Sequence, residues 1–240
     1  MTGLVVAIDG PSGTGKSTIS RRLAGELGLA YLDTGAMYRV ATWWCLHLGL
    51  DLTDHEAVAA AVRTIPMEIG TDPARPTFAV DGHDVAREIR STRISTAVSA
   101  VATNLGVRPE LQQRQREAIA AELQPGSFSG GRGVIAEGRD ITTVVAPDAP
   151  VRILLLADEE ARLQRRAREL HGTADAGALA ATRDQVVRRD ADDSTVANFT
   201  TAADGVVTVD TSTLTLDEAV ATVRAVITAA DENPRTQEQQ

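Results

Sequence analysis

The sequence predicts an α/β fold of three layers, with a doubly wound parallel sheet between two layers of helices. Short runs rich in Val, Ile and Leu alternate along the chain with segments of helical apolar spacing. A glycine-rich turn joins the first apolar run to the first helical segment, as in sheets of this class. The 240 residues are 43% hydrophobic and 24% charged, which is typical of a globular chain with one main domain.

The first strand is expected at residues 4–9 and the first helix from Lys16 onward. Between them, GPSGTGKS at residues 10–17 matches G-x-x-x-x-G-K-[ST]. Such a turn directs backbone N–H groups inward, and the helix that follows adds its positive dipole end. Lys16 can reach the β and γ phosphates of a nucleotide, and the Ser17 hydroxyl can bind Mg²⁺. The alternative is a turn without a ligand, but the strand before it and the helix after it favour a phosphate-binding loop (P-loop). ATPases, GTPases and kinases all use this loop.

The basic residues support this interpretation. The net charge is −9, which argues against an extensive nucleic-acid-binding surface. Of the 24 basic residues, 23 are arginine, and Lys16 is the only lysine in the chain. A general bias toward arginine does not explain where the exception lies. A compact ammonium group can enter a space between phosphate oxygens that the planar guanidinium group fits poorly.

The later elements follow in order. A short strand at 30–34 leads into a helix, and residues 66–84 carry three prolines, a strand at 77–80 and an Asp81-Gly82 turn, which indicates an inserted β-rich lobe. Helical spacing extends over 95–123 with a break near 106–110. Strands are expected at 134–137 (then a loop), 151–158 and 205–212, and helices at 159–172, 183–194 and 216–230. Residues 171–182 are expected to be a mobile connection, and 231–240 a disordered tail.

Membrane spans, signal peptides and disulfides are not expected. No apolar run reaches 18 residues, and the N-terminus enters the first strand without a basic leader. Cys45 is the only cysteine and lies on an apolar helical face, so a buried thiol is expected in preference to a reactive one. These features predict a cytoplasmic protein with no membrane partner.

Four further clusters carry charge that could serve phosphoryl transfer. Thr34 and Arg39 could grip an anion, although a helix cap and a surface arginine explain them equally well. The sequence EGRD places Glu137, Arg139 and Asp140 beyond a buried strand, where such sheets bind ligands; a charged turn is the alternative. Two arginine-rich clusters follow. The first could bind phosphate or be a solvated face, and it consists of Arg162, Arg165, Arg166 and Arg168. The second, taken alone, is a charged helix end, and it consists of Arg188, Arg189, Asp190, Asp192 and Asp193.

Together these segments make the chain resemble bacterial cytidylate kinases, in the nucleoside monophosphate (NMP) kinase group. The resemblance spans about residues 3–225 and rests on segments that occur in the family's order: IDGPSGTGKST, LDTGAMYR, VAREIRS, VRPELQQRQR, EGRDITTVVAPDAPVRILLLA, RRDADDS and AADGVVTVDTS. It implies transfer of the γ-phosphoryl group of ATP to CMP or dCMP, with Mg²⁺ as cofactor, in a monomer. It also implies one P-loop kinase domain, residues 1–230, with a core (1–65, 95–158, 200–230), an NMP-binding insert (about 66–94) and a helical lid (about 159–190).

The resemblance also implies a role for each matching position. ATP would be bound by Gly10, Pro11, Ser12, Gly13, Thr14, Gly15, Lys16, Ser17 and Thr18. The acceptor nucleotide would be bound by Thr34, Arg39 and Arg139 at its phosphate, by Ser99, Arg108 and Asp140 at cytosine, and by Asp193 at the ribose. Catalysis would depend on Lys16, Arg139, Arg162, Arg166 and Arg189, and Mg²⁺ would be held by Ser17 and, through water, by Glu137.

The chain departs from the family's pattern at Thr142, where Gly is usual, at Val196, where Arg is frequent, and at NFTTAADG, residues 198–205. Three alternatives remain: a kinase for another acceptor such as UMP or a metabolite alcohol, a GTP-dependent switch or regulatory ATPase, and a binding module without turnover. A GTPase needs the guanine-reading N-K-x-D, which a chain with one lysine, already used at position 16, lacks. The intact Lys16, Ser17, Glu137 and arginine cluster argue against an inactive binding module.

Overall fold

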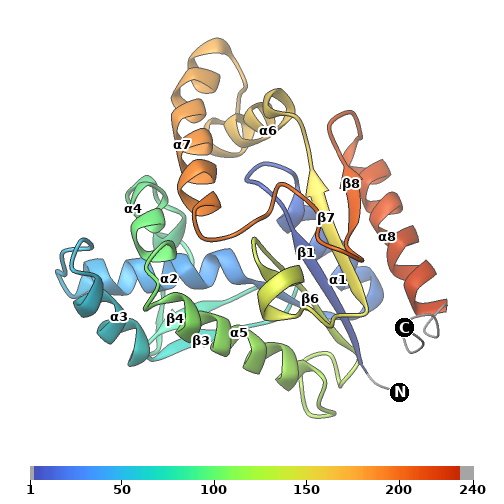
Figure 1. Cartoon of the computed structure of the whole chain (residues 1–240), viewed down its shortest axis with the longest axis horizontal. Coiled ribbons are helices and arrows are strands. Elements are labelled where there is room, and N and C mark those ends of the chain that lie inside the picture. The colour runs from blue at the N-terminus through green and yellow to red at the C-terminus, as the bar shows by residue number, and fades with distance from the viewer. Residues whose placement is uncertain (1–2, 233–240) are drawn as a thin grey trace.

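The central sheet has five parallel strands in the order β2–β6–β1–β7–β8 (Figure 1). The computed structural model describes residues 3–232, apart from the side chains of residues 184, 185, 231 and 232. The strands are β1 (Leu4–Asp9), β2 (Ala30–Asp33), β6 (Gly133–Gly138), β7 (Val151–Leu156) and β8 (Val207–Asp210). The predicted parallel sheet between helical layers is confirmed.

Helices cover both faces of the sheet, so its inner strands are mostly apolar, with Glu137 of β6 and Arg152 of β7 as charged exceptions. On one face, α1 (Lys16–Leu27) and α8 (Leu216–Glu232) pack on Val6 and Ile8 of β1. On the other face, α5 (Arg108–Glu122) and a π-helical turn, η2 (Ile141–Val145), pack over Ala7 of β1. The two clusters therefore use alternate residues of the same strand.

The parallel register brings the functional segments to one edge of the sheet. Asp9 at the end of β1 lies beside Gly138 of β6, and Glu137 lies beside Asp33 of β2. The phosphate-binding loop, the EGRD segment and the start of α2 (Thr34–His47) all follow from this edge. Residues more than 100 positions apart in sequence therefore form one site.

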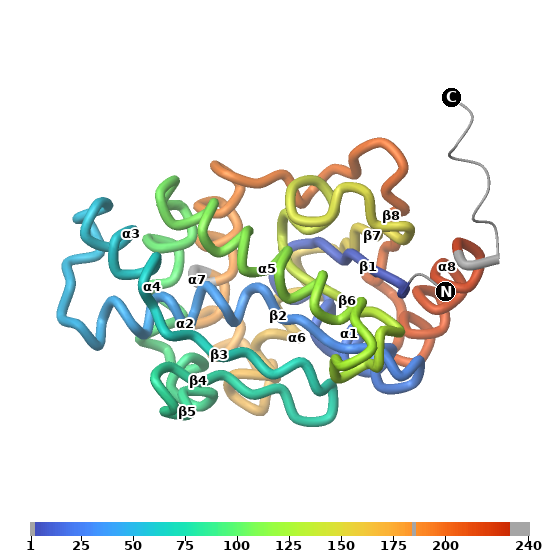
Figure 2. The backbone as a smooth tube through the Cα atoms, turned by 90° about the horizontal axis from the view of Figure 1, so that it is seen from below, coloured from blue at the N-terminus to red at the C-terminus, as the bar shows by residue number. Residues whose placement is uncertain are grey.

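The insert forms a second, antiparallel sheet of three short strands, β3 (Met67–Ile69), β4 (Phe78–Val80) and β5 (His83–Asp84). Asp81 and Gly82 have φ angles of 52° and 74°, which make the predicted tight turn between β4 and β5. Phe78 and Val80 pack against α2, and Figure 2 shows this small sheet on one side of the molecule below that helix.

The remaining elements pack around α2 or stand over the carboxyl edge of the sheet. A short 3₁₀ helix, η1 (Glu88–Arg90), leads into α4 (Thr92–Ala102), while α3 (His55–Arg63) packs on the outer part of α2. Cys45 is fully buried among these helices, as expected. The two helices α6 (Glu159–His171) and α7 (Ala176–Ser194) stand side by side over the carboxyl edge of the sheet (Figure 1). None of the helices in residues 3–232 is both long enough and apolar enough to cross a membrane.

Two expectations about local structure are wrong. Residues 171–182 are not one long connection, because α7 begins at Ala176, where the Asp175 side chain accepts the N–H of Ala178 and caps the helix. The segment after Glu137 is not an irregular loop throughout, because residues 141–145 form the turn η2. The tail expected from residue 231 includes the last two residues of α8, and residues 233–240 lie outside the described part of the chain.

Candidate active site

The loop between β1 and α1 wraps around the amine of Lys16. Lys16 Nζ donates to the carbonyl of Pro11 at 2.8 Å, and burial lowers the pKa of the amine. Gly13 has φ = 81°, and a Cβ at this position would meet the carbonyl oxygen of Arg162 at 2.7 Å. Glycine is therefore required where α6 lies directly on the loop.

The side chains of Ser17 and Glu137 place two oxygens that could bind a metal ion beside this loop. Ser17 Oγ donates to Glu137 Oε1 at 2.5 Å, and the hydroxyl of Tyr31 donates to the same oxygen at 2.9 Å. Burial, followed by the negative charge of Asp33, raises the pKa of the Glu137 carboxyl group. A buried carboxylate held next to a hydroxyl is a suitable ligand set for a hard cation such as Mg²⁺.

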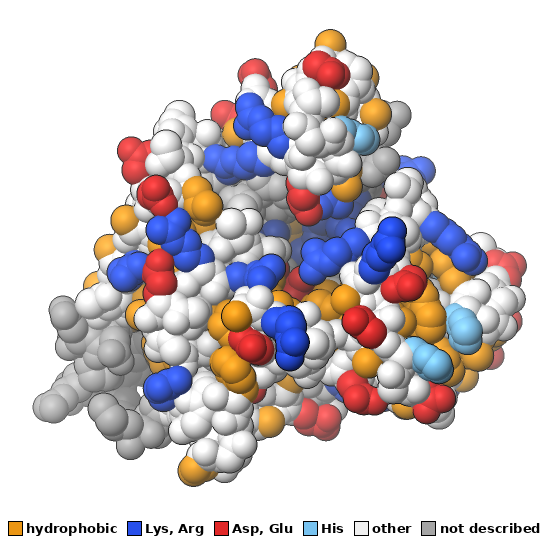
Figure 3. All heavy atoms as spheres, turned by 180° about the vertical axis from the view of Figure 1, so that it is seen from behind, with side chains coloured by type: hydrophobic (Ala, Val, Ile, Leu, Met, Phe, Trp, Pro, Cys, Tyr) orange, Lys and Arg blue, Asp and Glu red, His pale blue; other side chains and the backbone are white. Residues whose placement is uncertain are grey.

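A cavity of about 820 Å³ lies beside the phosphate-binding loop. Four guanidinium groups line it on the side opposite the loop, those of Arg39, Arg139, Arg166 and Arg189. Figure 3 shows lysine and arginine side chains around a hollow beneath the upper part of the molecule. Burial and then the neighbouring Arg166 lower the pKa of Arg39 to about 10, and burial and then Arg39 lower that of Arg189 to about 9. Charges of one sign so close together predict an anion in the cavity.

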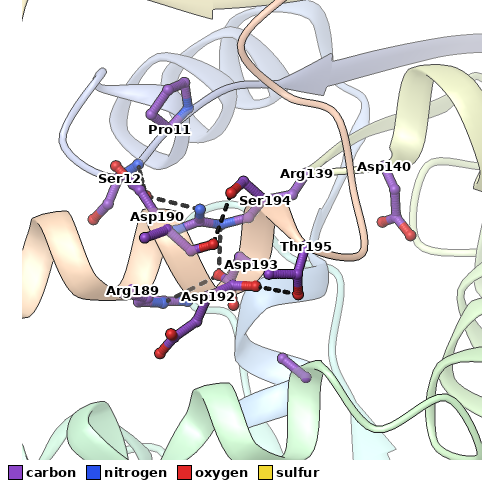
Figure 4. Close-up of polar contacts among 12 residues, drawn as sticks. Pro11, Ser12, Arg139, Asp140, Arg189, Asp190, Asp192, Asp193, Ser194 and Thr195 are labelled. Atoms are coloured by element: carbon purple, nitrogen blue, oxygen red, sulfur yellow. Dashed lines mark hydrogen bonds and ion pairs between the residues drawn. The ribbon is translucent and has the colours of Figure 1, made fainter.

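Carboxylates of the chain balance only part of this positive charge. Asp193 pairs with Arg139 Nε at 3.0 Å and with Arg189 Nε at 3.6 Å (Figure 4). Arg39 donates only to the carbonyl of Ile89 and the hydroxyl of Ser95, and within the described residues it has no carboxylate partner. The excess of buried positive charge therefore lies around Arg39.

A second polar group lies where α5 meets the EGRD segment. Asp140 Oδ2 accepts hydrogen bonds from Arg108 Nη2 at 2.6 Å and from Gln112 Nε2 at 2.7 Å. The Asp140 side chain is 5% exposed, so this carboxylate is buried together with its ion pair. Arg139 and Asp140 are consecutive, so the backbone between β6 and η2 links the phosphate-side cluster to this second group.

The structure brings most of the residues singled out in the sequence to the cleft, but not all. The phosphate-binding loop, Glu137 and the four arginines line the cavity. Thr34 is buried instead, and its hydroxyl donates to the carbonyl of Glu137 at 2.8 Å. Arg162 lies beside the loop, where it donates to the carbonyl of Ser12 at 3.1 Å. Ser99 on α4, Arg108 on α5, Asp140 after β6 and Asp193 on α7 all lie outside the residues that line the cavity.

Three other residues take part: Gln112, which the sequence did not single out, and Arg165 and Asp190, which it named only as members of charged clusters without a role of their own. Arg165 donates to the carbonyl and hydroxyl of Thr211, and that hydroxyl in turn donates to the carbonyl of Thr14 in the phosphate-binding loop. Asp190 contacts Arg139 and Arg162, and Gln112 contacts Asp140. The spacing of Arg165 from Arg162 was a usable signal. For Gln112 there was no signal, and the charged cluster that contains Asp190 did not indicate its partners, because they are distant in sequence.

Comparison with known proteins gives a consistent result. The family model described as cytidylate kinase matches residues 6–229 of the chain. A cytidylate kinase of Nocardia farcinica is 50% identical over 232 residues, which cover 94% of each chain. Those of Streptomyces avermitilis and Cutibacterium acnes are 46% and 47% identical and cover 95% and 90% of this chain, and 93% and 92% of the relatives.

Proposed function

The chain belongs to the cytidylate kinase family, and on this basis we propose that it transfers the γ-phosphoryl group of ATP to CMP or dCMP, giving ADP and CDP or dCDP. The observation that carries the proposal is the buried excess of cations around Arg39. A monophosphate placed there would neutralise guanidinium groups whose pKa values burial and mutual repulsion lower. The phosphate-binding loop on the opposite side of the same cavity would hold the phosphates of ATP.

The roles of the side chains follow from their places around the cavity. Lys16 stands at the loop and would stabilise the charge that develops on the transferred phosphoryl group. Arg39 and Arg139 would hold the acceptor phosphate, and Arg166 and Arg189 would stabilise charge on the transferred group between the two nucleotides. Little covalent chemistry is required of the protein in such a transfer, so positioning and charge stabilisation account for catalysis.

Magnesium is the cofactor that this site fits. Ser17 and Glu137 supply the hydroxyl and carboxylate oxygens that would hold the ion, together with oxygens of ATP. The ion would neutralise phosphate charge during transfer. Chelation of divalent cations with EDTA should abolish activity and addition of Mg²⁺ should restore it, whereas full activity in EDTA would contradict this assignment.

The remaining polar groups would select the base. Asp140 would accept a hydrogen bond from the cytosine N4 amino group, and Arg108 would donate to acceptors at N3 and O2. Ser99 would lie beside the base and Asp193 beside the ribose. Thr34 would act on the acceptor phosphate only if its hydroxyl left the carbonyl of Glu137.

We further propose that α6 and α7, about residues 159–190, form a lid and that residues 66–94 form the acceptor-side lobe. The lid supplies Arg162, which already contacts the phosphate-binding loop, and Arg166, which lines the cavity; both would contact the phosphates in the closed state. The proposal also includes a cytoplasmic location and a monomeric state, the latter because one chain supplies all of the residues assigned above. Light scattering of the purified protein tests the oligomeric state, and a mass of twice 25.4 kDa would contradict a monomer.

The decisive experiment is a coupled assay of ADP release from ATP with CMP, dCMP, UMP, AMP and GMP as separate acceptors. The proposal expects rapid turnover with CMP and dCMP and much lower kcat/KM with the other three. Equal rates with CMP and UMP would refute the base assignment, and ADP release that needs no acceptor would indicate an ATPase instead.

A further inference from the structure

The carboxylate of Asp190 on α7 is a point at which four parts of the fold meet (Figure 4). Oδ1 accepts a hydrogen bond from the backbone N–H of Ser12 at 3.2 Å and from Arg139 Nη1 at 2.8 Å. Oδ2 accepts one from Arg162 Nη1. These donors belong to the phosphate-binding loop, to the end of β6 and to α6. Asp190 thus joins both lid helices to the core.

Asp190 and Arg162 together hold the backbone of Ser12 through the two peptide groups on either side of it. The N–H of Ser12 donates to Asp190, and the carbonyl of Ser12 accepts from Arg162 Nη1 at 3.1 Å. The same Nη1 atom donates to Asp190, which closes a ring of three hydrogen bonds. A movement of α7 therefore displaces the phosphate-binding loop and the Arg162 side chain at the same time.

Asp190 also fixes the direction of Arg139. Its carboxylate holds Nη1, Asp193 holds Nε at 3.0 Å, and the guanidinium group lies 4.4 Å from the centre of the Phe199 ring. Because the guanidinium group is planar and rigid, two fixed nitrogens and one packed face determine where Nη2 points. Arg139 lines the cavity, so this orientation determines how it faces a bound phosphate.

Charge explains why a carboxylate is needed at this point. Arg139 and Arg162 would repel each other next to Lys16 if no anion stood between them. Burial acts to raise the pKa of Asp190, but Arg139, followed by the hydrogen bond from Arg162, outweighs it, and the pKa is lowered overall. The carboxylate is therefore ionised at neutral pH and can hold both cations.

We propose that Asp190 is a positioning residue for phosphoryl transfer, which fixes Arg139 of the core and Arg162 of the lid against the phosphate-binding loop. The proposal rests on the proposed function and adds a residue that touches neither nucleotide. Lid closure and the orientation of Arg139 would then be one event, because the same carboxylate holds both arginines. The alternative is that Asp190 only occupies a phosphate position in the empty site and leaves when ATP binds.

The first test is the steady-state kinetics of Asp190→Asn with ATP and CMP. Loss of the charge leaves both arginines misplaced, so we expect kcat to fall by roughly 100-fold. The KM values of both substrates should change by less than about threefold, because Asp190 contacts neither of them. If Asp190 instead competed with phosphate, the KM for ATP would fall and kcat would be unchanged, and this result would overturn the proposal.

The matched control is Asp192→Asn, which removes the same charge from the same helix. The Asp192 carboxylate makes no hydrogen bond or ion pair within the described residues and points away from Asp190 (Figure 4). It should keep wild-type kcat. Asp190→Glu retains the charge on a longer arm and should recover at least about tenfold of the lost kcat. No recovery with glutamate would count against a role for the charge.

Thermal unfolding and a double-mutant cycle separate positioning from a structural role. Asp190→Asn should unfold at a lower temperature than Asp192→Asn, because it loses two ion pairs, but it should be folded at the assay temperature. A lost activity explained by unfolding of Asp190→Asn at the assay temperature would overturn the proposal. Arg162→Ala combined with Asp190→Asn should lose little more kcat than the worse single variant, because the two residues act through one contact. Additive losses would overturn it as well. Inactivity of the wild-type protein toward CMP would refute the proposed function instead.

Discussion

Replacement of Asp140 by asparagine should convert a pocket that selects cytosine into one that accepts uracil. Arg108 and Gln112 both donate to Asp140 Oδ2, at 2.6 and 2.7 Å, whereas Oδ1 accepts no hydrogen bond within the described residues. Asparagine offers one carbonyl oxygen and one NH₂ group. Because two donors converge on the Oδ2 position, the asparagine oxygen must take it, and its NH₂ group must take the place of Oδ1. The group that faces the base thus changes from an acceptor to a donor.

The size of the change follows from the hydrogen bonds that are exchanged. Cytosine N4 loses a bond to a carboxylate, worth about 1.5–3 kcal/mol, and uracil O4 gains a neutral bond, worth about 0.5–1.5 kcal/mol. The preference for CMP over UMP should therefore weaken by about 2–4.5 kcal/mol, so the ratio of kcat/KM for CMP over UMP should fall by roughly 30- to 2000-fold. Activity with both substrates should also decrease, because Arg108, with a side chain only 12% exposed, loses its counter-charge.

The assay is kcat/KM for CMP and for UMP in the wild type, in Asp140→Asn and in Asp148→Asn. Asp148 is an exposed residue shortly after η2, so its variant controls for the loss of one negative charge. Its ratio should equal that of the wild type. An unchanged ratio in Asp140→Asn would show that Asp140 does not read the base, and its remaining role would be to orient Arg108.

Four further outcomes are expected. Lys16→Arg should lower kcat by about 100-fold or more because the planar fork does not fit the loop, and near-normal turnover would disprove this reason. Hydrogen exchange across residues 159–183 should be fast in the free protein and slow with both nucleotides bound; equal protection would refute a closing lid. Val196→Arg should lower the KM for CMP with little change in kcat, and a change confined to kcat would contradict it. The free energy of unfolding should decrease by up to about 3 kcal/mol as the pH rises from about 4 to above 6. Burial raises the pKa of Asp9 from its usual 3.8 to about 6, so in this pH range the folded state holds a proton that the unfolded state has lost. Calorimetry of Asp9→Asn should show a flatter pH dependence, and an identical curve would assign the effect to other groups.

The sequence predicted the elements whose signals are local. The apolar run at 4–9, the glycine-rich turn and the spacing of Ile19, Leu23 and Leu27 identify β1, the loop and α1 without tertiary information. The start of α7 was missed because small residues such as those at 176–182 suit a loop and a helix alike. The cap supplied by Asp175 and the packing on α6 stabilise the helical conformation of this segment.

The candidate site was predictable only in part, for a related reason. Lys16 and Ser17 follow β1, and Glu137 lies at the end of β6 in the same parallel sheet, so topology alone places them at the same edge. The partner of each charged group depends instead on how separate elements pack. Asp190 contacts Ser12, 178 positions away in the sequence, and Gln112 contacts Asp140, 28 positions away. No spacing in the sequence indicates either contact.

Thr142 shows how a departure from a family pattern can act on the scaffold and not on a substrate contact. Its hydroxyl donates to Asp9 Oδ2 at 2.6 Å, and its backbone N–H donates to the same oxygen at 2.7 Å. The N–H of Ile141 donates to the other oxygen at 3.0 Å. A glycine could supply the backbone bond but not the hydroxyl, which here lowers the pKa of a carboxyl group that burial raises. Asp9 ends β1 immediately before the phosphate-binding loop, and the turn held by Thr142 immediately follows Arg139 and Asp140. The extra hydrogen bond therefore fastens the segment that would bind the acceptor to the strand that carries the donor loop.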